Sequence, residues 1–165
     1  MIGKSVPRVD AYEKVTGRAK FTEDLLPKKC LVAKMLHATI GNGIVKSIDT
    51  SEAEIMEGVV KVVTFHDVPD HCYPTPGHPW SVELAHQDVA DRNLLTGRVR
   101  YYGDDIAAVV AEDEIIASRA LKKIKVEYEE YPVEIHPRKS MYGSKPPIHF
   151  DKKDNVLARS NYFIG

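Results

Sequence analysis

The chain has 165 residues, of which 43% are hydrophobic and 28% charged, a composition typical of a soluble globular domain and unlike that of a disordered segment. Its 23 basic and 24 acidic residues give a formal net charge of −1, so no nucleic-acid partner is predicted. No apolar run approaches the roughly 20 residues that span a bilayer, and the N-terminus has no hydrophobic signal core, so we expect a cytoplasmic protein without a membrane partner. Cys30 and Cys72 are interpreted as free thiols.

The first segment, residues 1–30, is predicted to be an extended N-terminal arm without helix. Pro7, Gly17 and Pro27 interrupt any helical pattern, and charges of both signs indicate a solvated surface. Scattered apolar residues are expected to dock the arm along the domain or along a neighbouring subunit.

An α+β core is predicted over residues 31–135. The apolar run 31–40 and the residues after Gly43 are expected to be strands joined by a tight hairpin, because Asn42-Gly43 supplies the positive φ values of such a turn. Thr50 or Ser51 is expected to cap a short helical turn, with Glu54 placed as in a capping box. The β-branched run 59–65 is predicted to be a central strand.

The segment 66–93 is predicted to be a long loop without regular structure, because prolines and glycines punctuate it. A loop of this length in a compact domain is functional, forms an interface or is poorly ordered. It concentrates borderline-soft metal ligands, namely His66, Asp67, Asp70, His71, Cys72, His78 and His86. Their spacing lacks the chelating pairs of a structural zinc site, so the histidines are interpreted as incidental and Trp80 as a packing anchor.

A strand, a helix and a second strand are predicted between Arg98 and Pro132. The unbroken apolar run 106–111 fits a strand covered on both faces, and Asp113 is placed to cap a helix whose apolar face includes Ala117 and Ala120. From Ile124 the apolar residues alternate with charged ones, which indicates a strand with one wet face. A unit of this length can give parallel neighbours with a right-handed connection, so a mixed sheet is expected.

The chain contains no convincing catalytic constellation. Gly-x-Ser-x-Gly and glycine-rich phosphate loops are missing from the sequence, and Cys72 beside His71 is interpreted as an incidental loop thiol. Asp104 and Asp105 are assigned to the polar turn before a buried strand. We therefore assign no catalytic, cofactor-binding or metal-binding residue. The irregular segment 136–165 has a strand-like end without a natural stop signal, so a truncation is expected there.

Three stretches, covering nearly the whole chain in order, resemble the N-terminal α/β-hammerhead domain of the molybdenum-binding subunit of xanthine dehydrogenases and aldehyde oxidases. They are PRVDAYEKVTGRAKFTEDL (residues 7–25), VKSIDTSEAEIMEGVVKVVTFHDVP (45–69) and VRYYGDDIAAVVAEDEIIASRALKKIKVEYEEYP (99–132). Residues 75–95 are similar to the corresponding loop of bacterial purine-hydroxylating members. The sequence departs from the family pattern at residues 41–44, which puts only local contacts in doubt.

The resemblance implies a fold and a parent activity. The fold is the α/β-hammerhead, and the activity is hydroxylation of a purine at a molybdopterin-bound molybdenum with oxygen from water, electrons passing through iron–sulfur clusters to FAD. The family's catalytic and cofactor residues lie in a larger region after this domain, and none is carried over onto this chain. The implied partners are the molybdenum domain of the same subunit, which would follow residue 165, and the FAD and iron–sulfur subunits.

The alternative hypothesis is a free-standing module that uses the same fold to bind a small ligand or a metal. A reading frame that continues past Gly165 indicates a domain of an enzyme, whereas a stop codon there indicates a module.

Overall fold

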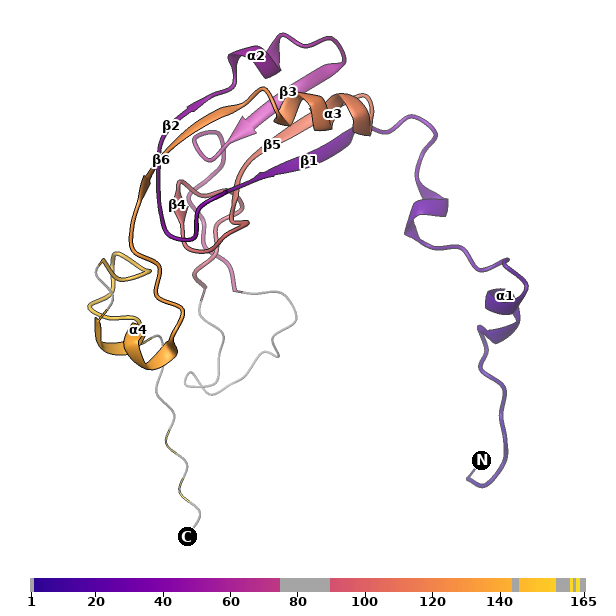
Figure 1. The fold of residues 1–165 in the computed structure, drawn as a ribbon. Helices are drawn as coiled ribbons and strands as arrows, with labels where there is room; N and C mark the ends of the chain where they lie inside the picture. Colours follow the sequence, from indigo (N-terminus) through magenta and orange to yellow (C-terminus); the bar gives the residue numbers. More distant parts are fainter. Residues whose placement is uncertain (1, 75–89, 144–145, 157–160, 162, 164–165) are drawn as a thin grey trace. The chain divides into compact units, whose positions relative to one another are not determined.

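The structure is a computed structural model that describes residues 2–74, 90–143, 146–156, 161 and 163 (Figure 1). The chain divides into two compact units, residues 1–30 and 31–165. No helix among the described residues is long and apolar enough to cross a membrane.

The N-terminal unit contains two short helical segments, α1 (Ala11–Val15) and η1 (Thr22–Leu25). The Asp10 carboxylate at the start of α1 pairs with Arg8 at 2.9 Å and with Lys14 at 2.7 Å, and the Thr16 hydroxyl donates to the Tyr12 carbonyl at 2.7 Å. These local interactions stabilise α1, and η1 is a second short helical segment, so the prediction of an arm without helix is wrong for these segments.

The second unit is built on two three-stranded antiparallel sheets. Strand β5 (Asp105–Ala111) lies between β1 (Val32–His37) and β3 (Val59–Thr64) in one sheet. Strand β2 (Gly43–Asp49) lies between β4 (Arg98–Val99) and β6 (Lys125–Glu130) in the other.

The α+β class with a strand–helix–strand unit is confirmed, but the mixed sheet with parallel neighbours is wrong. Both edges of β5 are already paired with β1 and β3. The strand that follows helix α3 (Glu114–Leu121) therefore cannot join β5 and pairs with β2 in the second sheet.

The predicted hairpin at residues 41–43 is also wrong, because β1 and β2 belong to different sheets. Asn42 is buried. Its side-chain amide donates to the Pro132 carbonyl at 2.8 Å, and its backbone carbonyl accepts from the Tyr131 amide at 2.9 Å. A Cβ on Gly43 would lie 2.3 Å from the Glu129 carbonyl oxygen. The glycine therefore permits a close approach of two backbones.

Helix α3 begins as predicted, with the Asp113 side chain accepting from the Ile116 amide at 2.7 Å. Its fully buried Ala117 and Ala120 pack with Val109 and other residues of β3, β5 and α2 (Ser51–Glu54). A second apolar cluster contains Ala38, Ile40, Val99 and Ile106. In β6 the exposed and half-buried residues alternate as predicted from Lys125 to Glu129.

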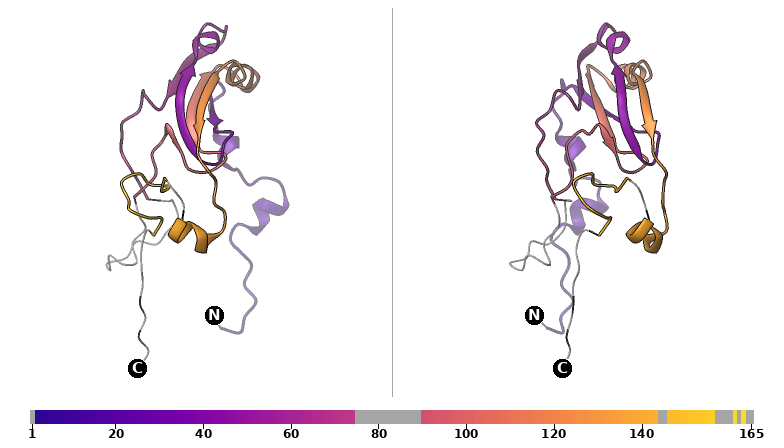
Figure 2. Two further views of the ribbon diagram at one scale, coloured as in Figure 1. Left: turned by 60° about the vertical axis from the view of Figure 1, so that its left-hand side comes forward. Right: turned by 90° about the vertical axis from the view of Figure 1, so that its left-hand side faces the viewer.

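The C-terminal segment, predicted to be irregular, contains helix α4 (Pro137–Gly143) (Figure 2). Pro137 occupies the first helical position, where its missing N–H is not needed, and the Ser140 amide donates to the His136 carbonyl at 2.9 Å. The strand-like end of the chain lies largely outside the described residues.

Candidate functional site

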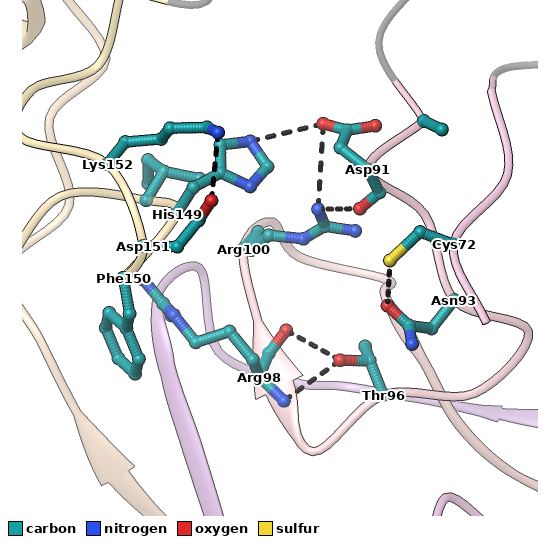
Figure 3. A pocket seen from close by; sticks show the side chains of 12 residues that line it. Cys72, Asp91, Asn93, Thr96, Arg98, Arg100, His149, Phe150, Asp151 and Lys152 are labelled. Carbon is teal, nitrogen blue, oxygen red and sulfur yellow. Dashed lines mark hydrogen bonds and ion pairs between the residues drawn. The ribbon is translucent and has the colours of Figure 1, made fainter. Parts of the chain in front are cut away.

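A hollow of about 380 Å³ lies where three segments of the second unit meet (Figure 3). The two ends of the long loop contribute Cys72, Asp91 and Asn93, and the C-terminal segment contributes residues 148–152. The third side is formed in and around β4, by Thr96, Arg98 and Arg100.

The ends of the long loop are tied together at the hollow. Tyr73 and Arg92 form an antiparallel bridge, with amide-to-carbonyl distances of 2.9 and 3.2 Å in the two directions. The Asn93 side-chain amide donates to Asp70 Oδ1 at 2.7 Å, and Cys72 Sγ lies 3.5 Å from Asn93 Oδ1. The described ends of the loop, on either side of residues 75–89, are therefore held together.

Arg98 of β4 contacts its neighbour β2 in the same sheet and the C-terminal segment. Its Nη1 donates to the carbonyls of Gly43, at 2.8 Å, and Val99. Its guanidinium lies 4.4 Å from the ring centre of Phe150 and 5.7 Å from that of Tyr131, distances at which cation–π attraction is effective. Burial lowers the pKa of Arg98, and no carboxylate of the described residues lies within ion-pair distance of it.

Arg100 is surrounded by carboxylates. It lies 3.7 Å from Asp91 and 3.9 Å from the buried Asp104, and it also donates to the Asp91 carbonyl. His149 Nε2 lies 3.1 Å from Asp91 Oδ2. Burial lowers the pKa of His149, the charge of Arg100 lowers it further and Asp91 opposes both.

The geometry of the hollow supports anchoring more than catalysis. A nucleophile needs an adjacent base, but the Cys72 thiol contacts the Asn93 amide, which is not a base. The charged groups are largely compensated: Arg100 by Asp91 and Asp104, and Lys152 by Asp151 at 2.9 Å. These contacts fasten the loop ends and the C-terminal segment to β4.

The ligand-rich residues of the loop are not brought together in the part of it that the structure describes. Asp67 turns back onto β3, accepting from the Thr64 amide and hydroxyl at 2.7 and 2.8 Å, which holds the pKa of its carboxyl below the usual range. His66 lies against Phe65, with ring centres 4.0 Å apart. Among the described residues, no group of three or more His, Cys, Asp or Glu side chains is placed to hold a metal. His78, Trp80 and His86 lie outside the described residues.

Asp104 and Asp105, which we predict to be turn residues, have different neighbours. Asp104 accepts from the Arg100 amide at 3.1 Å, whereas Asp105 pairs with His37 at 2.8 Å. They belong to the predicted turn and the start of β5. Cys30 and Cys72 are free and exposed, as predicted.

The sequence interpretation missed the residues that build the hollow. Arg98 and Arg100 flank buried Val99, and this spacing places two arginines on one side of a strand. The spacing can be seen in the sequence and indicates a charged site there. His149 and Phe150 carried no comparable local signal, because their role depends on contacts with residues about 50 positions earlier.

Comparisons with known proteins identify the family. Residues 16–132 match the family described as "Aldehyde oxidase and xanthine dehydrogenase, a/b hammerhead domain". The chain is 39% identical over 158 residues to a xanthine dehydrogenase molybdenum-binding subunit of Escherichia coli O157:H7, covering 96% of this chain and 21% of that protein. It is 30% identical over 162 residues to the nicotinate dehydrogenase large molybdopterin subunit of Eubacterium barkeri, covering 98% of this chain and 36% of that protein.

A solved structure with the same fold is the aldehyde oxidoreductase from Desulfovibrio desulfuricans ATCC 27774. It superposes with a TM-score of 0.74 at 33% identity, covering 89% of this chain and 16% of that chain. The chain thus spans between 16% and 36% of the length of these three proteins.

The described side chains do not fit the cofactors of these enzymes. The phosphate of a molybdopterin needs cationic donors that are free to bind it, whereas in the hollow Arg100 and Lys152 are paired with carboxylates and Arg98 Nη1 is bonded to carbonyl oxygens. A four-cysteine iron–sulfur cluster cannot be held by this chain alone, because it has two cysteines.

The family that matches residues 16–132 and the superposition on the aldehyde oxidoreductase structure point to the same family. The chain belongs to the α/β-hammerhead domain family of aldehyde oxidases and xanthine dehydrogenases.

Proposed function

We propose that this chain is the N-terminal structural and assembly domain of a cytoplasmic molybdenum hydroxylase that oxidises purines, with oxygen taken from water. The observation that carries the proposal is the 39% identity to a xanthine dehydrogenase molybdenum-binding subunit, over 96% of this chain but only 21% of that protein. In this proposal the chain holds no active site. The molybdopterin-bound molybdenum, the iron–sulfur clusters and FAD belong to other domains or subunits.

We propose a separate role for each of three segments of the chain. Residues 1–30 form an arm that contacts neighbouring parts of the enzyme, residues 31–135 form the hammerhead core, and residues 136–165 lead to the molybdenum domain. Large apolar side chains in the arm support its role, since Val9 and Val15 are more than four-fifths exposed, and exposed apolar surface of this kind marks interaction sites.

A purine substrate is favoured by the relatives. Identity to the xanthine dehydrogenase subunit is 39%, against 30% for the nicotinate dehydrogenase subunit. The similarity of residues 75–95 to the loop of purine-hydroxylating members points the same way. Xanthine is therefore the first substrate to test.

The long loop is proposed as the surface that contacts the partner subunits. Its base is closed by the Tyr73–Arg92 bridge and braced through Arg100 and Asp91. We therefore expect the described ends of the loop to stay joined when residues 75–89 are replaced.

The test replaces residues 75–89 by a pair of glycines in the complete enzyme. We expect the shortened subunit to fold, with an unchanged circular dichroism spectrum, but to lose co-purification with the iron–sulfur and FAD subunits. Cys72→Ser at the edge of the hollow is the control and is expected to assemble normally. Full assembly of the shortened enzyme would refute the role of the loop.

A further inference from the structure

One face of the β1-β5-β3 sheet is apolar although helix α3 does not cover it. In the register of the sheet, Ala108 lies opposite both Met35 and Val63, and Val110 lies opposite both Ala33 and Lys61. Residues directly opposite in an antiparallel pair share a face. We call the face formed by the five apolar residues Ala33, Met35, Val63, Ala108 and Val110 the outer face, with Lys61 at its rim.

The other face of the same sheet is fixed by contacts with α3, which packs against β1, β5 and β3 (Figure 2). Lys34 Nζ bonds to Glu114 and Ser118 of this helix at 2.8 and 3.0 Å. Because successive strand residues point to opposite faces, Ala33 and Met35, the neighbours of Lys34, point away from α3.

The two faces differ in how deeply their residues are buried. On the helix side, Val62 is 4% exposed and Val109 is fully buried. On the outer face Ala33 is exposed and the other four apolar residues are half-buried, and none of the five belongs to either hydrophobic core. An antiparallel sheet with one solvated face normally carries polar residues there. The apolar run of β5 is predicted to be covered on both faces, and among the described helices α3 covers one of them.

We propose that the outer face is a packing surface for an apolar element of the same subunit, contributed by polypeptide beyond this chain. This inference rests on the proposed function. The chain corresponds to 21% of the length of the E. coli relative, so most of such a subunit lies outside it and is available to cover the face. Ala108 at the centre of the face, with no side chain beyond Cβ, leaves room for an inserted side chain, and the larger Met35 and Val63 flank it.

The first test compares two substitutions in the complete enzyme. Met35→Lys places an ammonium on the outer face, and Ile115→Lys places one on the solvent side of α3, where Ile115 is 64% exposed. An unpaired charge buried at an interface is strongly unfavourable, so Met35→Lys should lower the recovery of molybdenum-loaded enzyme by about tenfold or more. Ile115→Lys should leave it within about twofold. Equal recovery of the two variants would overturn the proposal.

The second test needs no substitution. Lys61 is exposed at the rim of the outer face, and a short lysine-directed cross-linker applied to the wild-type enzyme should join it to a peptide that follows residue 165 in the same subunit. A link to residues 1–30, to a second copy or to another subunit, or no link beyond its own domain, would overturn the assignment.

The same preparation separates the two proposals. If it contains molybdenum and hydroxylates xanthine while Met35→Lys is harmless, the surface is wrong and the proposed function stands. If it contains no molybdenum, the proposed function fails whatever the cross-links show.

Discussion

The apolar core beneath α3 and the charged hollow beside β4 are held together by different forces. The core consists of fully buried aliphatic residues such as Val109, Ala117 and Ala120, whose burial is stabilising in proportion to area and needs no particular partner. The hollow depends on Arg98 and Arg100, each positioned by several oriented contacts. The core therefore supplies stability, and the hollow fixes the positions of segments that leave the core.

This comparison predicts that the largest losses of stability come from apolar deletions. Ile106→Ala removes a fully buried side chain from the second core cluster and should lower the free energy of unfolding by about 2–5 kcal/mol. Ile115→Ala on the solvent side of α3 should change it by less than about 0.5 kcal/mol. Urea unfolding measures both, and equal losses would mean that the structure misplaces the core.

A smaller loss is expected where two backbones approach each other. Gly43→Ala would place a Cβ 2.3 Å from the Glu129 carbonyl oxygen, and relieving that overlap should cost about 1–3 kcal/mol. Gly41→Ala is the matched control, because its Cβ would meet the side chain of Val133, at 3.0 Å or more, and no backbone atom among its nearest neighbours. If the two variants were equally stable, the close contact of β2 with β6 would be wrong.

The helix cap should contribute less again. Asp113→Ala removes the acceptor for the Ile116 amide and should destabilise the fold by about 1 kcal/mol. Asp113→Asn retains an acceptor and should be nearly neutral in the same unfolding measurement. A neutral effect of Asp113→Ala would contradict the predicted helix start.

The smallest effect is a pH dependence confined to the hollow. The pKa of His149 is lowered from 6.5, mainly by burial, so the unfolded chain binds a proton at this site more readily than the folded chain. Stability from this site is therefore complete above the unfolded pKa and decreases as pH falls through that value and toward the folded pKa. Urea midpoints compared at about pH 7.5 and about pH 5.5 should show a smaller difference in His149→Gln than in the wild type. An unchanged difference would show that His149 does not contribute to the pH dependence of stability.

The sequence predicts the elements that depend on neighbouring residues better than the contacts between distant ones. Helix α3, its Asp113 cap and the alternating strand β6 were predicted, because these patterns are set by neighbours in the sequence. The pairing of the strands was not. An Asn-Gly sequence usually makes a hairpin, but in this fold the buried Asn42 bonds to residues 131 and 132, far along the chain.

Local sequence patterns could not predict the hollow, for a similar reason. Its lining joins residues near 72, 91, 98 and 149, and no periodicity in the sequence encodes contacts over such separations. Only the Arg98-Val99-Arg100 spacing gave a usable signal.

The central claim is that this chain is a scaffold domain whose chemistry is performed elsewhere in a molybdenum hydroxylase. The direct measurement is molybdenum content and xanthine hydroxylation, determined in parallel for purified residues 1–165 and for the complete enzyme with its partner subunits. The account predicts metal and activity in the complete enzyme, and a folded chain 1–165 with neither. Stoichiometric molybdenum and xanthine turnover in residues 1–165 alone would contradict it.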